Sequence, residues 1–150
     1  KHLSPEQRLL IGLNTCDGMG AMSPTRGKKA TEESLEDIRS RLPDSGKVVL
    51  LAGLGGGAGT GAIPTLIKEI TQRGQDLLVA VTLPFELETE RREVAVAGLK
   101  DLEAADVAVI THDHAENLTG SMGLEEAFEN SARAITQKVQ IWIQGESDAQ

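Results

Sequence analysis

The feature that most constrains this chain is the stretch of nine residues at positions 53–61, GLGGGAGTG, in which six are glycine. It follows Lys47–Ala52, a continuous apolar run that predicts a strand buried on both faces of a sheet. It precedes Ala62–Gln72, where apolar residues recur at helical spacing and predict a helix. The glycine stretch therefore occupies a junction between a buried strand and a helix.

A junction of this kind is suited to binding phosphate. The start of a helix presents free backbone N–H groups and the positive end of the helix dipole. Glycines let the backbone approach a ligand closely, and Thr60 adds a hydroxyl group. The alternative is a tight turn with no ligand, but a turn needs one or two glycines, and more of them cost backbone entropy. We therefore interpret the stretch as a phosphate cradle.

Strand and helix patterns alternate along the whole chain, which predicts an α/β domain with three layers and a mostly parallel sheet. Residues 1–144 are expected to form this domain, with 145–150 as a flexible tail. The core must consist of Leu, Ile, Val and Ala, because only 2% of the residues are aromatic. We expect strands at Arg8–Ile11, Lys47–Ala52, Asp76–Leu83 and Asp106–Thr111, helices at 24–42, Ala62–Gln72, Glu88–Ala104 and Gly123–Gln144, and loops at Asn14–Ser23, Pro84–Glu88 and Thr111–Gly123.

Charge and cysteine content indicate which partners are disfavoured and which cellular compartment is expected. The formal net charge is −8 and the isoelectric point is about 4.9, so nucleic acid and anionic lipid are disfavoured as partners. Cys16 is the only cysteine, and neither a signal-like stretch nor an apolar run of membrane-spanning length is present. These features predict a cytoplasmic protein without direct membrane insertion.

Two known phosphate-binding motifs can be tested against the glycine stretch. A P-loop requires Lys followed by Ser or Thr at the helix start, and no Lys is present there. The dinucleotide-binding fingerprint fits the spacing from Gly53 to Ala58. Its ribose-binding acid is expected about 20 residues further on, whereas Glu86 and Glu88 are more than thirty residues away. A dinucleotide-dependent enzyme remains an alternative.

The segment GLGGGAGTGAIP resembles the signature loop of the tubulin/FtsZ family, with Ala58 where that family usually has Thr. The resemblance implies a Rossmann-like nucleotide-binding domain that binds GTP or GDP, with Mg²⁺ held by phosphate oxygens and waters. It assigns phosphate contacts to one run of residues: Gly55, Gly56, Gly57, Ala58, Gly59, Thr60 and Gly61.

The resemblance extends upstream. Gly18-Met-Gly-Ala21, followed by the segment from Ser23 to Ser34, is similar to the family's loop over the γ-phosphate and the helix after it. By that match Gly20 and Ala21 are phosphate-side residues. The loop is one residue shorter than in the family, and Asp17 replaces the usual Arg at its start.

The resemblance also extends downstream. The segment from Pro84 to Glu88, with Arg92 after it, is similar to the family's ribose-binding segment. The match assigns Glu88 to the ribose, and it places Arg92, Pro84 and Phe128 beside the nucleoside. The alternative for Glu88 and Arg92 is an exposed ion pair between residues four apart on a helix. The family's two guanine-reading residues after Phe128 are replaced by Ala132 and Arg133.

Two pieces of the family pattern are not found in the sequence. One is a first strand with a second glycine-rich loop, and the other is a catalytic loop that completes the site of a neighbouring subunit. We therefore expect an excerpt, a sheet completed by another polypeptide, or a rewired sheet. Catalytic residues stay unassigned, and we expect weak or no nucleotide binding and little or no GTP hydrolysis by this chain alone.

The resemblance implies a nucleotide-binding module of a cell-division or cytoskeletal filament, whose partner is a second copy or an FtsZ-like protein. The alternative within this class is a non-hydrolysing regulator that docks on such filaments. His112 and His114 flank Asp113, but no third metal ligand is evident, and we expect no metal site. Cys16 is interpreted as a packing residue, and Trp142 as part of the core.

Overall fold

A parallel sheet of three strands forms the centre of the protein. The computed structural model describes residues 3–117 and 123–145. The strands are β1 (Lys47–Gly53), β2 (Asp76–Leu83) and β3 (Ala108–Asp113), and β2 lies in the middle. Leu50, Val79 and Val109 are aligned across the sheet. The carboxyl ends of all three strands therefore meet at one edge.

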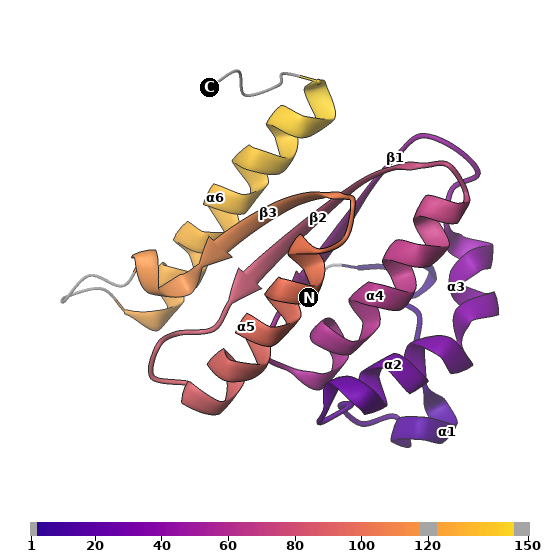
Figure 1. Cartoon of the computed structure of the whole chain (residues 1–150), viewed down its shortest axis with the longest axis horizontal. Coiled ribbons are helices and arrows are strands. Elements are labelled where there is room, and N and C mark those ends of the chain that lie inside the picture. The colour runs from indigo at the N-terminus through magenta and orange to yellow at the C-terminus, as the bar shows by residue number, and fades with distance from the viewer. Residues whose placement is uncertain (1–2, 118–122, 146–150) are drawn as a thin grey trace.

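Helices cover both faces of this sheet. On one face lie α4 (Gly57–Gln72) and α5 (Thr89–Glu103), and on the other lies α6 (Leu124–Gln144) (Figure 1). Each parallel crossover between neighbouring strands contains one of the helices α4 and α5, as parallel pairing requires. The predicted α/β architecture with three layers is confirmed.

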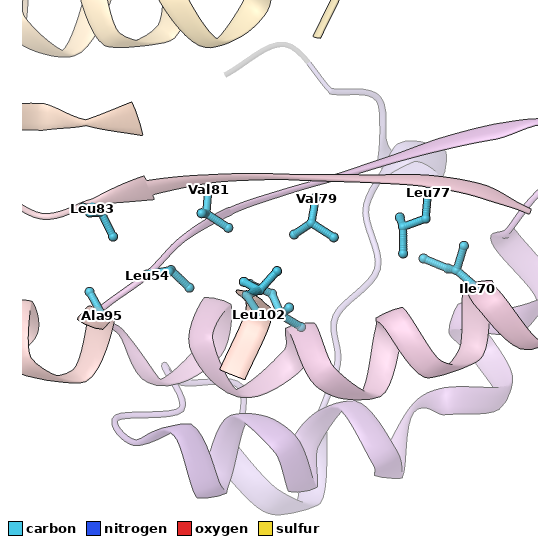
Figure 2. Packing of buried hydrophobic residues seen from close by; sticks show 9 residues of the cluster. Leu54, Ile70, Leu77, Val79, Val81, Leu83, Ala95 and Leu102 are labelled. Atoms are coloured by element: carbon cyan, nitrogen blue, oxygen red, sulfur yellow. The ribbon is translucent and has the colours of Figure 1, made fainter. Parts of the chain in front are cut away.

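The main core lies between β2 and the helix pair α4 and α5. Side chains of alternate β2 residues point from the strand toward α4 and α5 (Figure 2). Val79 and Val81 are fully buried there, and Ile70 of α4 is 1% exposed. Because burial of a Val or Ile side chain contributes about 1.5–3 kcal/mol, this contact fixes the helix layer on the strands. The central strand β2 has the bounds that its apolar pattern predicts.

The expected helix at 24–42 is two helices, α2 (Pro24–Glu33) and α3 (Leu35–Arg41). Ser23 caps α2 by accepting a hydrogen bond from the Arg26 amide. The break falls at Ser34, whose hydroxyl accepts the Gly12 amide at 2.9 Å. This buried hydrogen bond holds Ser34 against the N-terminal segment, at the point where α2 ends and α3 begins. α2 packs along α4, on the side of α4 away from the sheet (Figure 2).

Two predictions for the N-terminal region are wrong. Arg8–Ile11 forms no strand, and Leu10 is 64% exposed. Within residues 3–117 and 123–145 no strand pairs with this segment, so its backbone N–H and C=O groups join no ladder. The segment Asn14–Ser23 is not all loop, because it contains most of the short helix α1 (Leu13–Cys16). Gly12 before this helix and Asp17 after it both have a left-handed backbone conformation. A short 3₁₀ turn, η1 (Pro5–Gln7), precedes it.

The prediction that Lys47–Ala52 is buried on both faces is also wrong. β1 is an edge strand of the described sheet, and Leu51 on its α6-facing side is 63% exposed. Helix α6 contacts β2 and β3 instead. The corresponding side chains of β2, Leu78 and Ala80, are fully buried under α6. An apolar run thus identified the strand but not its place in the sheet.

The C-terminal elements are close to their predicted bounds. β3 lies two residues later than expected, so it takes in the first three residues of the expected loop Thr111–Gly123, and the 3₁₀ turn η2 (His114–Asn117) follows it. Trp142 is not in the core: it is half-buried, and Lys47 Nζ lies 5.1 Å from its ring centre. Lys47 also donates to the carbonyl of Ile143 at 2.9 Å, which caps the end of α6. The rest of the loop, 118–122, and the expected tail beyond Gly145 lie outside the described residues.

Candidate functional site

The glycine stretch connects β1 to α4, and the helix begins inside it. α4 starts at Gly57, five residues before the predicted Ala62, and Gly56 is its N-cap. No side chain of the described residues caps this helix. The first four N–H groups of a helix have no partner within it, and here they belong to residues 56–59. These amides are available to an anion.

Gly55 and Thr60 close the turn that precedes the helix. The Gly55 amide donates to the Thr60 hydroxyl at 2.9 Å. Gly55 has a φ of +92°, a backbone conformation that residues with a side chain rarely adopt. A Cβ atom added at Gly55 would also lie 2.5 Å from the Arg91 carbonyl oxygen of α5. The glycine stretch and the start of α5 are therefore in direct backbone contact.

Three further glycines of the stretch, all in α4, have a packing role that the sequence pattern does not indicate. A Cβ atom at Gly57 would lie 2.4 Å from the Ser23 backbone nitrogen, and one at Gly61 would lie 2.2 Å from the Pro24 carbonyl oxygen. A Cβ atom at Gly59 would lie 2.2 Å from the Gly53 carbonyl oxygen. These glycines let α4 approach α2 and the end of β1. The glycine content thus serves helix packing as well as amide exposure.

Gly27 completes this close approach from the side of α2. A Cβ atom there would lie 2.0 Å from the Gly57 carbonyl oxygen. The sequence carried a signal for this contact, because a glycine inside a helix costs about 1 kcal/mol relative to alanine. Gly27 stands in the interior of α2, where that cost requires a reason.

The loop at 17–23 lies against the glycine stretch. Ala21 is 5% exposed, and Gly20 has open space around it. Met22 has a φ of +60°, and its carbonyl carbon lies 2.8 Å from the Cβ position of Gly57. The structure therefore brings together the two segments that the resemblance assigns to phosphate, although they are more than thirty residues apart.

A pocket of about 660 Å³ lies at the carboxyl ends of β2 and β3. Small-molecule pockets are typically about 300–1,000 Å³ and mostly apolar, and this one has both properties. The ring of Phe85 lies 5.3 Å from that of Phe128, edge to face. The lining residues come from the β2–α5 loop, α5, η2 and α6: Phe85, Glu86, Leu87, Glu88, Arg91, Ala115, Leu124 and Phe128.

The predicted ribose and base residues divide into two groups. Glu88 and Phe128 line the pocket together. Arg92 and Pro84 do not line it. Instead the Arg92 guanidinium donates to the Pro84 carbonyl at 2.6 Å and forms a bidentate ion pair with Asp113. The alternative of a Glu88–Arg92 ion pair is wrong, because Glu88 pairs with Arg91.

His114 joins the aromatic rings at the back of the pocket. Its ring stacks on Phe85 at 5.3 Å and meets Phe128 edge to face at 5.0 Å. Its Nδ1 lies 2.9 Å from the Ser131 hydroxyl. Burial lowers the pKa of His114 from its ordinary 6.5, and the nearby His112 lowers it further. The neutral imidazole is thus favoured in the folded protein.

This pKa direction predicts how stability depends on pH. A histidine whose pKa is lower in the folded state takes up its proton first in the unfolded state. The free energy of unfolding should therefore be highest above pH 6.5 and decrease as the pH falls through the lowered pKa. Urea denaturation between neutral pH and pH about 5 measures this decrease. A His114→Gln variant should show a flatter profile, and an unchanged profile would contradict the assignment.

Residues 3–117 and 123–145 show neither a metal-binding cluster nor a membrane-spanning helix. No group of three His, Cys, Asp or Glu side chains there is arranged to hold a metal ion. Asp113, between the two histidines, is engaged with Arg92, and its pKa is lowered chiefly by that hydrogen bond. None of the described helices is long and apolar enough to cross a bilayer.

The sequence matches a known protein family over most of its length. A profile described as "Tubulin/FtsZ family, GTPase domain" matches residues 2–118. The cell division protein FtsZ of Methanothermobacter thermautotrophicus is 39% identical over 126 residues, which is 81% of this chain and 33% of that protein. FtsZ of Helicobacter pylori strain J99 is 40% identical over 105 residues, which is 69% of this chain and 27% of that protein. The chain spans about a third of the length of these relatives.

Solved structures show the same fold. One titled "FtsZ dimer, empty (M. jannaschii)" superposes with a TM-score of 0.80 at 30% identity, and covers 90% of this chain and 40% of its own. CetZ1 from Haloferax volcanii, a GDP-bound monomer, superposes with a TM-score of 0.78 over 99% of this chain and 48% of its own. At 19% identity the second match is a likeness of fold.

Proposed function

Because the chain belongs to the tubulin/FtsZ family, we propose that it carries the phosphate and nucleoside half of a guanine-nucleotide site. The family's matched region is a GTPase domain, in relatives that are cell-division proteins. The uncapped start of α4 carries the proposal. It presents backbone N–H groups at a strand–helix junction whose neighbouring pocket has the size of a ligand site.

The phosphates would lie at the start of α4. Gly56 has open space where a Cβ atom would be, so no atom of the described residues fills the volume on that side of its Cα. The Thr60 hydroxyl accepts from Gly55 but keeps its own proton, which it can donate to a phosphate. The contacts proposed on this side are Gly55, Gly56, Gly57, Ala58, Gly59, Thr60 and Gly61, with Gly20 and Ala21 from the neighbouring loop.

The nucleoside would occupy the pocket beside this loop. The exposed ring of Phe128 offers a face on which a base can stack. Glu88, partly exposed at the start of α5, has carboxylate oxygens that can accept from ribose hydroxyls. Both side chains line one pocket, which supports binding of a nucleoside rather than of an isolated phosphate.

Mg²⁺ fits this site only as a companion of the nucleotide, since the described residues hold no cluster of three ligands. Mg²⁺ commonly keeps several waters and binds through substrate phosphates. Bound in this way, Mg²⁺ would neutralise part of the negative charge of the phosphates. We assign no residue of this chain to a catalytic step, and we propose weak binding with little hydrolysis by the chain alone.

The partner we propose is a second copy of this chain or an FtsZ-like protein in a filament in the cytoplasm. Two observations support it. The relatives are FtsZ proteins, and one similar structure is titled a dimer. In the described part of the chain the outer edge of β1 pairs with no strand, so another polypeptide could complete the sheet.

Titration of the ¹⁵N-labelled 150-residue chain with GDP at millimolar concentrations, followed by amide NMR, tests the nucleotide proposal. We expect saturable shifts of amides in residues 53–61 and 84–92. Guanosine should shift only the second group, because it lacks phosphates. NAD⁺ tests the dinucleotide alternative. Absence of shifts in both segments, or tighter binding of NAD⁺ than of GDP, would contradict the proposal.

A further inference from the structure

We infer that His114 positions the two aromatic walls of the pocket, Phe85 and Phe128, and that protonation of its ring weakens ligand binding there. This inference rests on the proposed function and adds a regulation to it, because the affinity for a nucleoside becomes dependent on pH. The observation that carries it is the packing of three rings from three separate parts of the chain: the β2–α5 loop, η2 and α6.

The three rings form one packed cluster. The ring of His114 stacks on that of Phe85, with the ring centres 5.3 Å apart and the planes inclined by 30°. The Phe128 ring meets both of them edge to face, at 5.3 Å from Phe85 and 5.0 Å from His114. Both arrangements are the ones that aromatic pairs prefer at such distances. The stacked pair of His114 and Phe85 therefore holds the Phe128 ring from one side.

His114 lies behind the pocket walls and not in the lining. Phe85 and Phe128 both line the pocket, whereas His114 does not. Phe85 is 8% exposed and Phe128 is 49% exposed, so the part of the Phe128 ring that the cluster leaves uncovered is available to a ligand. A nucleoside would thus touch the two phenylalanines and not the imidazole. His114 is a positioning residue that acts through both rings.

Polar and charged groups surround the His114 ring on every side. From α6 the hydroxyl of Ser131, itself 1% exposed, lies 2.9 Å from Nδ1. The ring of His112, on the β3 side, has its centre 6.2 Å away. The titratable groups whose charges act on His114 are His112 and Asp113 of β3, and Glu88 and Arg91 around the start of α5.

A positive charge on this ring is unfavourable where the ring now lies. Burial lowers the pKa of His114 most, and His112 and Arg91 lower it as well. The carboxylates of Asp113 and Glu88 act in the opposite direction. A protonated ring would lack hydration among the phenylalanines and would gain by moving toward water and these carboxylates. Protonation should therefore draw the ring out of the stack.

The direction of the effect on binding follows from linkage. A ligand that needs the packed rings binds better to the protein with neutral His114 than to the protonated form. Its affinity should therefore be highest above the lowered pKa of His114 and decrease as the pH falls through it. By the same reciprocity, a bound nucleoside should lower the pKa of His114 further.

Aromatic NMR of the full chain without ligand tests the positioning role. The chain has two phenylalanines, one tryptophan and no tyrosine, so the ring signals of Phe85 and Phe128 can be followed individually. We expect both to shift with the same midpoint pH as the imidazole signals of His114. Nuclear Overhauser contacts between His114 and the two rings should weaken below that midpoint. Phenylalanine signals that do not follow the His114 titration would overturn the inference.

Titration with guanosine across the same pH range tests the effect on binding. Guanosine is preferred to GDP because a terminal phosphate changes its charge at about pH 6, which would add a second pH dependence. We expect the affinity to decrease at least about fivefold as the pH passes below the His114 midpoint, the lower end of typical coupling between two sites. The midpoint of the affinity profile should coincide with that of the imidazole signals.

Three variants separate the ring from its proton. His114→Phe and His114→Gln both remove the titrating group, so their guanosine affinity should not change with pH. At neutral pH His114→Phe should lose less affinity than His114→Gln, because it keeps an aromatic ring in the stack. His112→Gln should move the midpoint to higher pH, since His112 lowers the pKa of His114. A wild-type pH profile in His114→Phe would contradict the inference.

Failure of the inference and failure of the proposed function give different results. If neither guanosine nor GDP binds the wild-type chain at any pH, the proposed function is refuted, and the ring signals without ligand still decide the positioning role. If guanosine binds with an affinity that stays constant while His114 titrates, only the inference is refuted.

Discussion

Replacing Gly61 with alanine is expected to lower the free energy of unfolding by about 3 kcal/mol. Alanine is the better helix former, so the helix term alone would raise stability by about 1 kcal/mol. The added methyl group would lie 2.2 Å from the Pro24 carbonyl oxygen and 2.7 Å from the Lys28 backbone nitrogen. Backbone atoms cannot move away by changing a rotamer, so α2 and α4 must separate.

Urea denaturation with a constant m-value measures this loss. Gly20→Ala is the matched control, since Gly20 has open space around it and a change there should stay within about 0.5 kcal/mol. Gly27→Ala should act like Gly61→Ala because the same helix pair must separate, and the two should be less than additive. A Gly61→Ala variant as stable as wild type would refute the close approach of α2 to α4.

Gly56→Asp is expected to abolish measurable nucleotide binding while leaving the fold intact or slightly more stable. Gly56 is the N-cap of α4 with a φ of −100°, and a Cβ atom there meets nothing within 4 Å. Aspartate is a good N-cap and interacts favourably with the helix dipole, which contributes about 0.3–1 kcal/mol. Its carboxylate would occupy the place proposed for a phosphate.

Repulsion between two unit charges 4 Å apart is about 1–4 kcal/mol for effective dielectric constants of 80 to 20, so affinity should fall roughly a hundredfold. Gly56→Asn is the neutral control, because asparagine caps the helix equally well without the charge. The NMR titration with GDP and thermal unfolding are the two measurements. Unchanged GDP shifts at residues 53–61 in Gly56→Asp would show that phosphate binds elsewhere.

The two substitutions are informative together because each should change a different property of the protein. Gly61→Ala should destabilise the fold through packing, and Gly56→Asp should spare the fold and remove binding. If every glycine of the stretch served only packing, both substitutions would act on stability. If every glycine served only the ligand, neither substitution would lower the stability of the fold. The structure predicts a division between Gly56, which has open space around it, and the closely packed Gly55 and the three glycines of α4.

The candidate site was predictable from sequence in its composition and only partly in its contacts. The glycine stretch, Glu88 and Phe128 could be chosen from residue type and spacing, because helix starts bind anions through any sequence that exposes their amides. From sequence alone, Asp113 and His114 suggest only metal ligation, and the lack of an evident third ligand argues against that role. Neither residue could be placed correctly, since Asp113 lies 21 residues from Arg92 and His114 lies 17 from Ser131.

By itself the sequence determined the layered α/β order and the existence of β2, α5 and α6, because hydrophobic periodicity is a local property that records which face of an element is buried. Tertiary structure alone decided that Arg8–Ile11 is no strand, that Leu51 stands at an open edge and that Arg91 rather than Arg92 faces the pocket. Each of these depends on which distant segment lies within a few ångströms. Spacing along the chain carries no record of that distance.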